Sequence, residues 1–116
     1  MKELGGYKFN HVDCFWCMVS RLDEYIDSLN DDDIQNKQGV YVFFDWDDNP
    51  IRVGKASKCR NRILQYYTSH KNEYVFDEME KDISFVSVLY TESPKERAYI
   101  EADIISKYNP KYNYTV

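Results

Sequence analysis

The chain has 116 residues, of which 43% are hydrophobic and 30% charged, and its formal net charge is −5. This length suits one domain that buries a modest core without needing disulfides or metals. No apolar run approaches the roughly 20 residues that span a bilayer, and the N-terminus lacks a signal-peptide pattern. Its three cysteines, an odd number, argue against a secreted disulfide framework. We therefore expect a cytoplasmic protein with no membrane partner.

Hydrophobic periodicity predicts three helices and three strands. The last helix has the strongest start, because Ser93-Pro94-Lys95-Glu96 can form a capping box with proline in its first turn. In the first strand, alternation places Tyr41 and Phe43 on one face and Val40, Val42 and Phe44 on the other. The predicted elements are an irregular segment 1–12, a helix 14–29, strands 39–46 and 51–54, a helix from Ser57 to about Ser69, a strand 83–91 and a helix 94–108.

This order predicts an α/β fold of the α+β kind, a small three-stranded antiparallel sheet flanked by helices. Residues 1–38 form an N-terminal helical extension, and residues 39–116 form the main domain. The charge is polarised: ten acids and two bases lie between Asp13 and Asp48, whereas six Lys or Arg and no acid lie between Arg52 and Lys71. One segment could therefore face phosphates although the net charge is negative, but such a run is often a solvated helix face.

Several side chains in the second half could perform chemistry. Glu101 lies on or beside the apolar stripe of the last helix, where a carboxylate needs a cation, a metal or access to water. Arg62 and Tyr66 share one face of the middle helix, and an arginine can bind a phosphate through two parallel hydrogen bonds. The segment 54–57 leads into that helix's N-terminus, where free amides favour an anion. Each feature alone also has an ordinary structural explanation.

The order and spacing of these residues resemble the GIY-YIG nuclease family, most closely the N-terminal nuclease domain of bacterial UvrC-type excinucleases. The resemblance covers about residues 39–116. Its motifs are Gly39-Val40-Tyr41, Arg52-Val53-Gly54 with Lys55-Ala56, Arg62 ten residues after Arg52, Tyr66 four later, Glu101, and Asn113 at the end of Pro110-Lys111-Tyr112-Asn113.

The resemblance implies a DNA endonuclease that uses one divalent cation, Mg²⁺ or Mn²⁺, held by Glu101. It implies that Arg62 neutralises the scissile phosphate and that Tyr41 helps a water to lose its proton. The remaining matched or basic residues would bind substrate, and they are Gly54, Lys55, Lys58, Arg60, Tyr66 and Asn113. Specificity would come from a protein partner or a homodimer, or the enzyme would cut with little sequence preference.

Arg52 departs from the family pattern, because the second half-motif should begin with tyrosine. A phenol with a pKa near 10 is a poor base at neutral pH, but a nearby cation favours the phenolate. Arg52 could therefore activate Tyr41 and count among the catalytic residues. The alternative is a catalytically degenerate module that binds nucleic acid or protein. A different alternative is a thiol redox or metal-binding protein that uses Cys14 and Cys17, although the more ordinary interpretation of that pair is two small apolar residues in a core helix.

Overall fold

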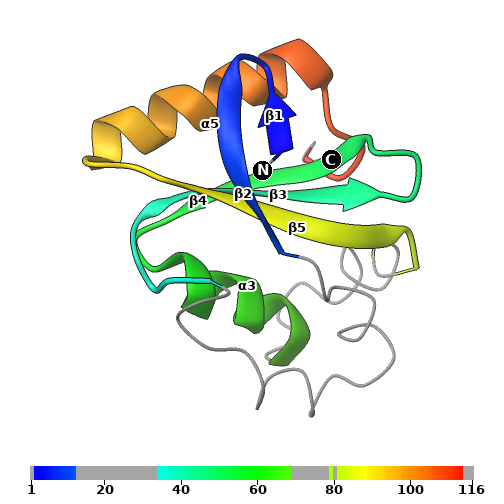
Figure 1. Ribbon diagram of the computed structural model, residues 1–116, viewed down its shortest axis with the longest axis horizontal. Coiled ribbons are helices and arrows are strands. Elements are labelled where there is room, and N and C mark those ends of the chain that lie inside the picture. Colours follow the sequence, from blue (N-terminus) through cyan, green and yellow to red (C-terminus); the bar gives the residue numbers. More distant parts are fainter. Residues whose placement is uncertain (1, 13–33, 69–78, 80, 114–116) are drawn as a thin grey trace.

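The structure, a computed structural model, describes residues 2–12, 34–68, 79 and 81–113. Five strands form one antiparallel sheet in the order β1-β2-β5-β3-β4, with one helix on each face (Figure 1). The elements are β1 Lys2–Leu4, β2 Tyr7–Val12, β3 Gly39–Asp45, β4 Pro50–Ala56, α3 Cys59–Thr68, β5 Ile83–Tyr90 and α5 Pro94–Tyr108. Within the described residues, no helix is long and apolar enough to cross a membrane.

The N-terminal segment corrects the sequence-based expectation. The sequence predicts an irregular segment 1–12 and a sheet of three strands, but β1 and β2 form a hairpin that adds two strands beside β5. Gly5 and Gly6 both have positive φ, 59° and 89°, as a tight two-residue turn requires. The Gly-Gly pair followed by alternating apolar and polar residues from Tyr7 is the signal in the sequence for this hairpin. The predicted helix 14–29 and the Cys14/Cys17 pair lie outside the described residues.

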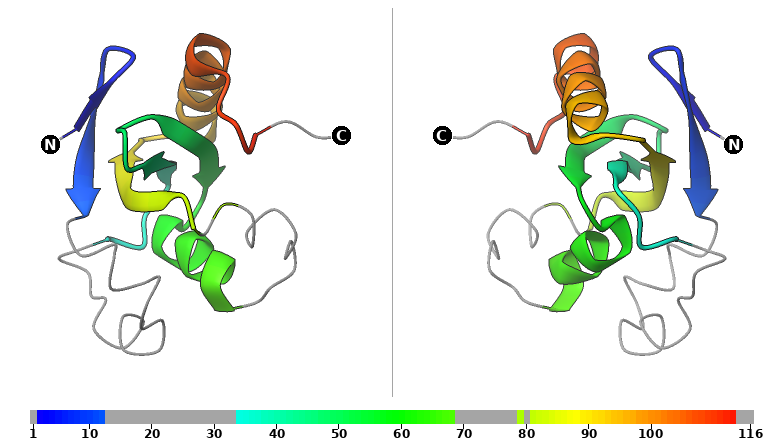
Figure 2. Two further views of the ribbon diagram at one scale, coloured as in Figure 1. Left: turned by 90° about the vertical axis from the view of Figure 1, so that its right-hand side faces the viewer. Right: turned by 90° about the vertical axis from the view of Figure 1, so that its left-hand side faces the viewer.

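The central strand β3 has one core on each of its faces. Tyr41 and Phe43 pack toward α3, in a cluster that includes Ile63 of that helix. Val40, Val42 and Phe44 pack on the other face, in a cluster that includes Ile100 and Ile104 of α5 and Leu4 and Phe9 of the hairpin. Figure 2 shows α5 and α3 on opposite sides of the sheet, with the hairpin beside α5. The predicted alternation along this strand is therefore confirmed.

The ends of α5 and α3 show different kinds of capping. Ser93 accepts a hydrogen bond from the Glu96 amide at 3.1 Å, as the capping-box pattern predicted for α5. The helix α3 begins at Cys59, two residues after Ser57, which the sequence suggested as its cap. The amides of Cys59 and Asn61 donate to the Lys37 carbonyl (2.9 Å) and to the Asn36 side chain (3.1 Å).

Candidate functional site

The N-terminus of α3 is partly filled by the protein itself. Because residues 36–37 accept hydrogen bonds from the Cys59 and Asn61 amides, those two donors are not offered to an anion. The expectation of an anion site made by free amides after Gly54-Lys55-Ala56-Ser57 is corrected in that respect. Binding of an anion at this helix would therefore depend more on side chains than on these amides.

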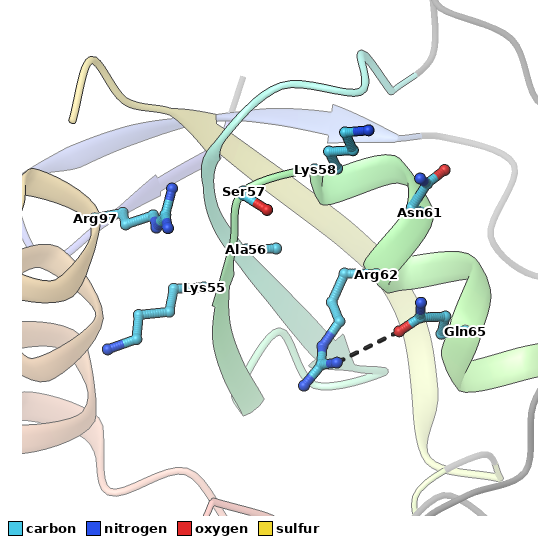
Figure 3. A pocket seen from close by; sticks show the side chains of 8 residues that line it. All are labelled: Lys55, Ala56, Ser57, Lys58, Asn61, Arg62, Gln65 and Arg97. Carbon is cyan, nitrogen blue, oxygen red and sulfur yellow. Dashed lines mark hydrogen bonds between the residues drawn. The ribbon is translucent and has the colours of Figure 1, made fainter. Parts of the chain in front are cut away.

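An open pocket of about 410 Å³ lies where the end of β4, the start of α3 and the start of α5 meet (Figure 3). Four of its side chains are cations, and no Asp or Glu lines it among the described residues. Such a positive pocket favours an anionic ligand. Its lining residues are Lys55, Ala56, Ser57, Lys58, Asn61, Arg62, Gln65 and Arg97.

Arg62 and Arg97 reach this pocket from opposite helices (Figure 3). Arg62 Nη1 donates to Gln65 Oε1 on α3 at 3.4 Å. Arg97 Nη1 donates to Gln38 Oε1 at 2.8 Å, and Gln38 immediately precedes β3. A glutamine oxygen orients a guanidinium without cancelling its charge, so these contacts preserve the positive potential of the pocket.

Glu101 lies one turn after Arg97 on α5, and its side chain is 20% exposed. The Lys55 ammonium is 3.6 Å from Glu101 Oε1, and Lys55 also lines the pocket. Lys55 therefore connects the carboxylate to the basic pocket at the β4 edge of the sheet. The structure contains no group of three or more His, Cys, Asp or Glu side chains able to hold a metal within the residues that it describes. Within those residues Glu101 therefore does not belong to a cluster of potential metal ligands.

Tyr41 lies directly opposite Gly54 in the β3–β4 pairing and is 2% exposed. A Cβ at Gly54 would be 2.7 Å from Tyr41 Cε2 and nearer still to Cζ and the hydroxyl oxygen. The absence of a side chain at Gly54 is therefore what lets the phenol cross β4. Gly54 thus leaves room for the Tyr41 ring. Neither Gly54 nor Tyr41 is among the residues that line the pocket.

Arg52 pairs with Phe43 and so projects from the same face of the sheet as Tyr41. Its Nη1 donates to the Tyr112 carbonyl at 2.7 Å, in the segment that follows α5. The cation is therefore partly committed to holding the C-terminal segment against β4. It lies on the correct face to influence Tyr41 electrostatically.

Asn113 binds the backbone of β4. Its Oδ1 accepts from the Val53 amide at 2.6 Å, and its Nδ2 donates to the Val53 carbonyl at 2.7 Å. The side chain thereby occupies both main-chain groups of Val53 on the outer edge of the sheet. Asn113 therefore holds β4, the strand that carries Gly54 and Lys55, while the substrate binding that the sequence suggested for Asn113 stays a prediction.

The other residues singled out in the sequence fall in different places. Lys58 lines the pocket, whereas Arg60 does not. Tyr66 belongs to α3, and its side chain lies outside the described part of the structure. Burial raises the pKa of the Cys59 thiol to about 12, although the charge of Arg97 acts in the opposite direction. That thiol stays protonated at neutral pH and is not a nucleophile.

Sequence reasoning missed Arg97, Asn61 and Gln65 as pocket residues, whereas Ser57 belongs to the segment 54–57 that was expected beside an anion. Arg97 precedes Glu101 by four residues, so both lie on one face of α5. That spacing was a readable signal once Glu101 had been singled out. Asn61 and Gln65 flank Arg62 on α3, but they face the pocket through the packing of α3, which no local pattern specifies.

Comparison with known proteins identifies the family. The family model described as the UvrC-like GIY-YIG domain matches residues 37–114. The chain belongs to this family of UvrC-like GIY-YIG nuclease domains, as the order of its motifs suggested.

Relatives by sequence include the UvrABC system protein C of Lachnospira eligens, 36% identical over 78 residues, and that of Clostridioides difficile, 37% identical over 81 residues. These matches cover 66% and 69% of this chain, but each covers 13% of the relative. The chain thus corresponds to a small part of those proteins.

A solved structure gives the same result for the fold. The GIY-YIG N-terminal endonuclease domain of UvrC from Thermotoga maritima, bound to its catalytic magnesium, superimposes with a TM-score of 0.61 at 28% identity. The alignment covers 68% of this chain and 85% of that one.

Proposed function

We propose that this protein is a divalent-metal-dependent endonuclease that hydrolyses phosphodiester bonds of DNA. The observation that carries the proposal is the meeting of a four-cation pocket with a single carboxylate, Glu101, through Lys55. Cations bind the charged backbone, and one carboxylate can bring a metal ion to it. The magnesium-bound UvrC endonuclease domain of similar fold supports the same reaction.

In this proposal Arg62 binds the phosphate that is cleaved. Its guanidinium projects into the pocket, is held by Gln65, and offers paired donors to two phosphate oxygens. Because charge grows on those oxygens in the transition state, a fixed cation there lowers the barrier. Lys55 and Lys58 contribute to binding the same strand. Arg60 and Tyr66 remain proposed substrate contacts on α3.

Glu101 would hold the metal ion. Mg²⁺ usually binds one or two carboxylates and keeps several waters, so a lone and partly exposed carboxylate fits Mg²⁺ or Mn²⁺ better than it fits zinc. When bound, the ion supplies charge stabilisation for the leaving oxygen. The Lys55 ammonium is 3.6 Å from Glu101 Oε1, which is long for a hydrogen bond. A divalent cation, with its higher charge, would therefore replace Lys55 beside this carboxylate.

Tyr41 is the proposed base, and Arg52 the group that makes it effective. A cation on the same face of the sheet lowers the free energy of the phenolate relative to the phenol. Gly54 fixes the direction of the ring, because the ring lies over its backbone. The residues thus have separate tasks: Tyr41 accepts a proton as its phenolate, Arg52 stabilises that phenolate before the transfer, and Asn113 positions β4, the strand that carries Arg52.

The alternative is a module that binds nucleic acid without cutting it. Two observations favour this alternative: Tyr41 is 2% exposed, and the Arg52 guanidinium donates to the Tyr112 carbonyl. Under this alternative Tyr41 is a core residue, and Arg52 has replaced a catalytic phenol with a structural cation. The basic pocket would keep its ligand.

The decisive experiment incubates the protein with supercoiled plasmid in Mg²⁺, in Mn²⁺ and in chelator. We expect nicking that requires a divalent ion and falls at least about a hundredfold in Glu101→Gln, while DNA binding persists. Glu96→Gln removes a carboxylate from the exposed first turn of the same helix and serves as the matched control. Equal binding and no cleavage by the wild type and Glu101→Gln would establish the non-catalytic module instead.

Partners and location are parts of the same proposal. The relatives are named as components of the UvrABC system, and a protein partner or a second copy of this chain could supply specificity. DNA as the substrate agrees with a cytoplasmic location. Size-exclusion chromatography with light scattering, with and without DNA, would detect self-association.

A further inference from the structure

Arg97 contributes to the basic pocket from a different layer of the molecule than the other cations. Lys58 and Arg62 come from the α3 side and Lys55 from β4, whereas Arg97 comes from α5 on the opposite face of the sheet (Figure 3). A ligand that touches both arginines must therefore extend across the end of β4. A single phosphate bound by Arg62 does not require Arg97.

The guanidinium of Arg97 is held in place without being neutralised. Its Nη1 donates to Gln38 Oε1 at 2.8 Å, and the Gln38 carbonyl accepts from the Thr91 amide at 3.1 Å. Gln38, which precedes β3, is thus anchored to the residue that follows β5, and its side chain holds Arg97 in turn. Arginine keeps further N–H donors in the same plane, which suit a phosphate.

We propose that Arg97 binds a second backbone phosphate, adjacent to the phosphate held by Arg62, so that the pocket recognises a nucleic-acid strand rather than an isolated phosphate group. This inference rests on the proposed nuclease function and names how the site selects its substrate class. Arg97 is a binding residue in this scheme. It sets substrate length and affinity, and it takes no part in proton transfer.

The test measures binding of a fluorescent single-stranded oligonucleotide of about 12 nucleotides, in chelator, at several salt concentrations. Each phosphate contact contributes a slope of roughly −0.7 to log K against log salt for a single strand. We expect Arg97→Gln to make the slope shallower by about that amount and to weaken binding roughly tenfold at low salt. Arg97→Lys should keep the slope and lose only part of the affinity, because it keeps the charge without the planar fork.

Lys95→Gln is the matched control, because it removes one positive charge from an exposed position on the same helix, outside the pocket lining. Its slope should equal that of the wild type. A labelled dinucleotide with one phosphodiester should bind wild type and Arg97→Gln equally. Melting temperatures of all variants identify any that fail to fold. If Arg97→Gln does not fold, the affinity of Arg97→Lys is compared with that of the wild type instead.

The outcomes separate this inference from the nuclease proposal. An unchanged slope and affinity in folded Arg97→Gln overturns the inference, even if the wild type cleaves DNA. A weakened Arg97→Gln together with a wild type that never cleaves supports the inference as a binding mode and overturns the nuclease. A wild type that neither binds nor cleaves overturns both.

Discussion

The phenol ring of Tyr41 lies across the backbone of Gly54, in the position that a side chain of Gly54 would occupy. Gly54→Ala would therefore force a buried and tightly packed ring to move. We expect a loss of about 1–3 kcal/mol in the free energy of unfolding, and reduced cleavage. Urea denaturation measures the first effect and plasmid nicking the second.

The control for this substitution is a double-mutant cycle. In a Tyr41→Ala background the added methyl group meets no ring, so Gly54→Ala should then cost little. An equal cost in both backgrounds would show that the effect does not pass through Tyr41.

Asn113→Ala removes both hydrogen bonds to the Val53 backbone and leaves the outer edge of β4 without that partner. We expect the free energy of unfolding to fall by about 1–3 kcal/mol. Asn113→Asp keeps the acceptor but loses the donor, so its free energy of unfolding should lie between those of the wild type and Asn113→Ala. Asn10→Ala, at an exposed position of β2, is the control and should change stability by less than about 0.5 kcal/mol. Equal effects of Asn113→Ala and Asn10→Ala would contradict this role.

Arg52→Met tests whether the cation activates Tyr41. The variant should lower the cleavage rate roughly tenfold or more at neutral pH. It should also shift the rising limb of the pH–rate profile to higher pH, since the phenolate loses its stabilising charge. Arg52→Lys should keep part of both effects. An unchanged profile in Arg52→Met would remove Arg52 from the catalytic residues, and faster cleavage by Arg52→Tyr would favour a degenerate wild-type site.

The hairpin is tied to α5 by a hydrogen bond from the Tyr7 hydroxyl to Asp103 Oδ2 (2.7 Å). This bond is the main cause that raises the pKa of Tyr7 to about 12 and that lowers the pKa of Asp103, with Lys107 as the next contributor to the latter. The stabilisation from Asp103 is complete above the ordinary carboxyl pKa of about 4 and is lost as the pH falls through the lower folded value. The stabilisation from Tyr7 is complete below about pH 10 and is lost as the pH rises through about 12.

Tyr7→Phe should therefore flatten both limbs of the plot of melting temperature against pH. Ultraviolet titration should also show one late-ionising tyrosine fewer. Some loss of stability at acid pH should remain in Tyr7→Phe, because the pKa of Asp82 is lowered mainly by the Tyr112 hydroxyl, which this variant keeps. Asp47→Asn, at an exposed turn position, is the control. Identical curves for Tyr7→Phe and wild type would show that the Tyr7–Asp103 bond contributes nothing.

Local patterns predicted the parts of the fold that depend on local chemistry. The alternation along β3 and the capping box at Ser93 were correct, because strand geometry and an N-cap involve neighbours in sequence. The hairpin could have been predicted from Gly5-Gly6 but was missed, since its strands are short.

The remaining contacts of the site join residues that are far apart in sequence. Asn36 fills the start of α3 from 25 residues away, and Asn113 reaches Val53 across 60. No period or motif spacing specifies such partners. The residue types at Arg62 and Glu101 could be selected from the sequence, and the helical spacing of Arg97 from Glu101 was readable there. The meeting of Arg97 with Arg62 in one pocket required the packing of α5 and α3 around β4.

The hydrogen bonds that complete the β4 edge also bear on how the molecule folds. Arg52, Val53 and Ile51 are each joined to residues 112–113, so closing this edge means closing a loop of about 60 residues. Loop closure of this length is slow compared with forming a hairpin or a helix. We therefore expect β3 and β4 to pair early and the outer edge of β4 to close late, when residues 112–113 dock against it.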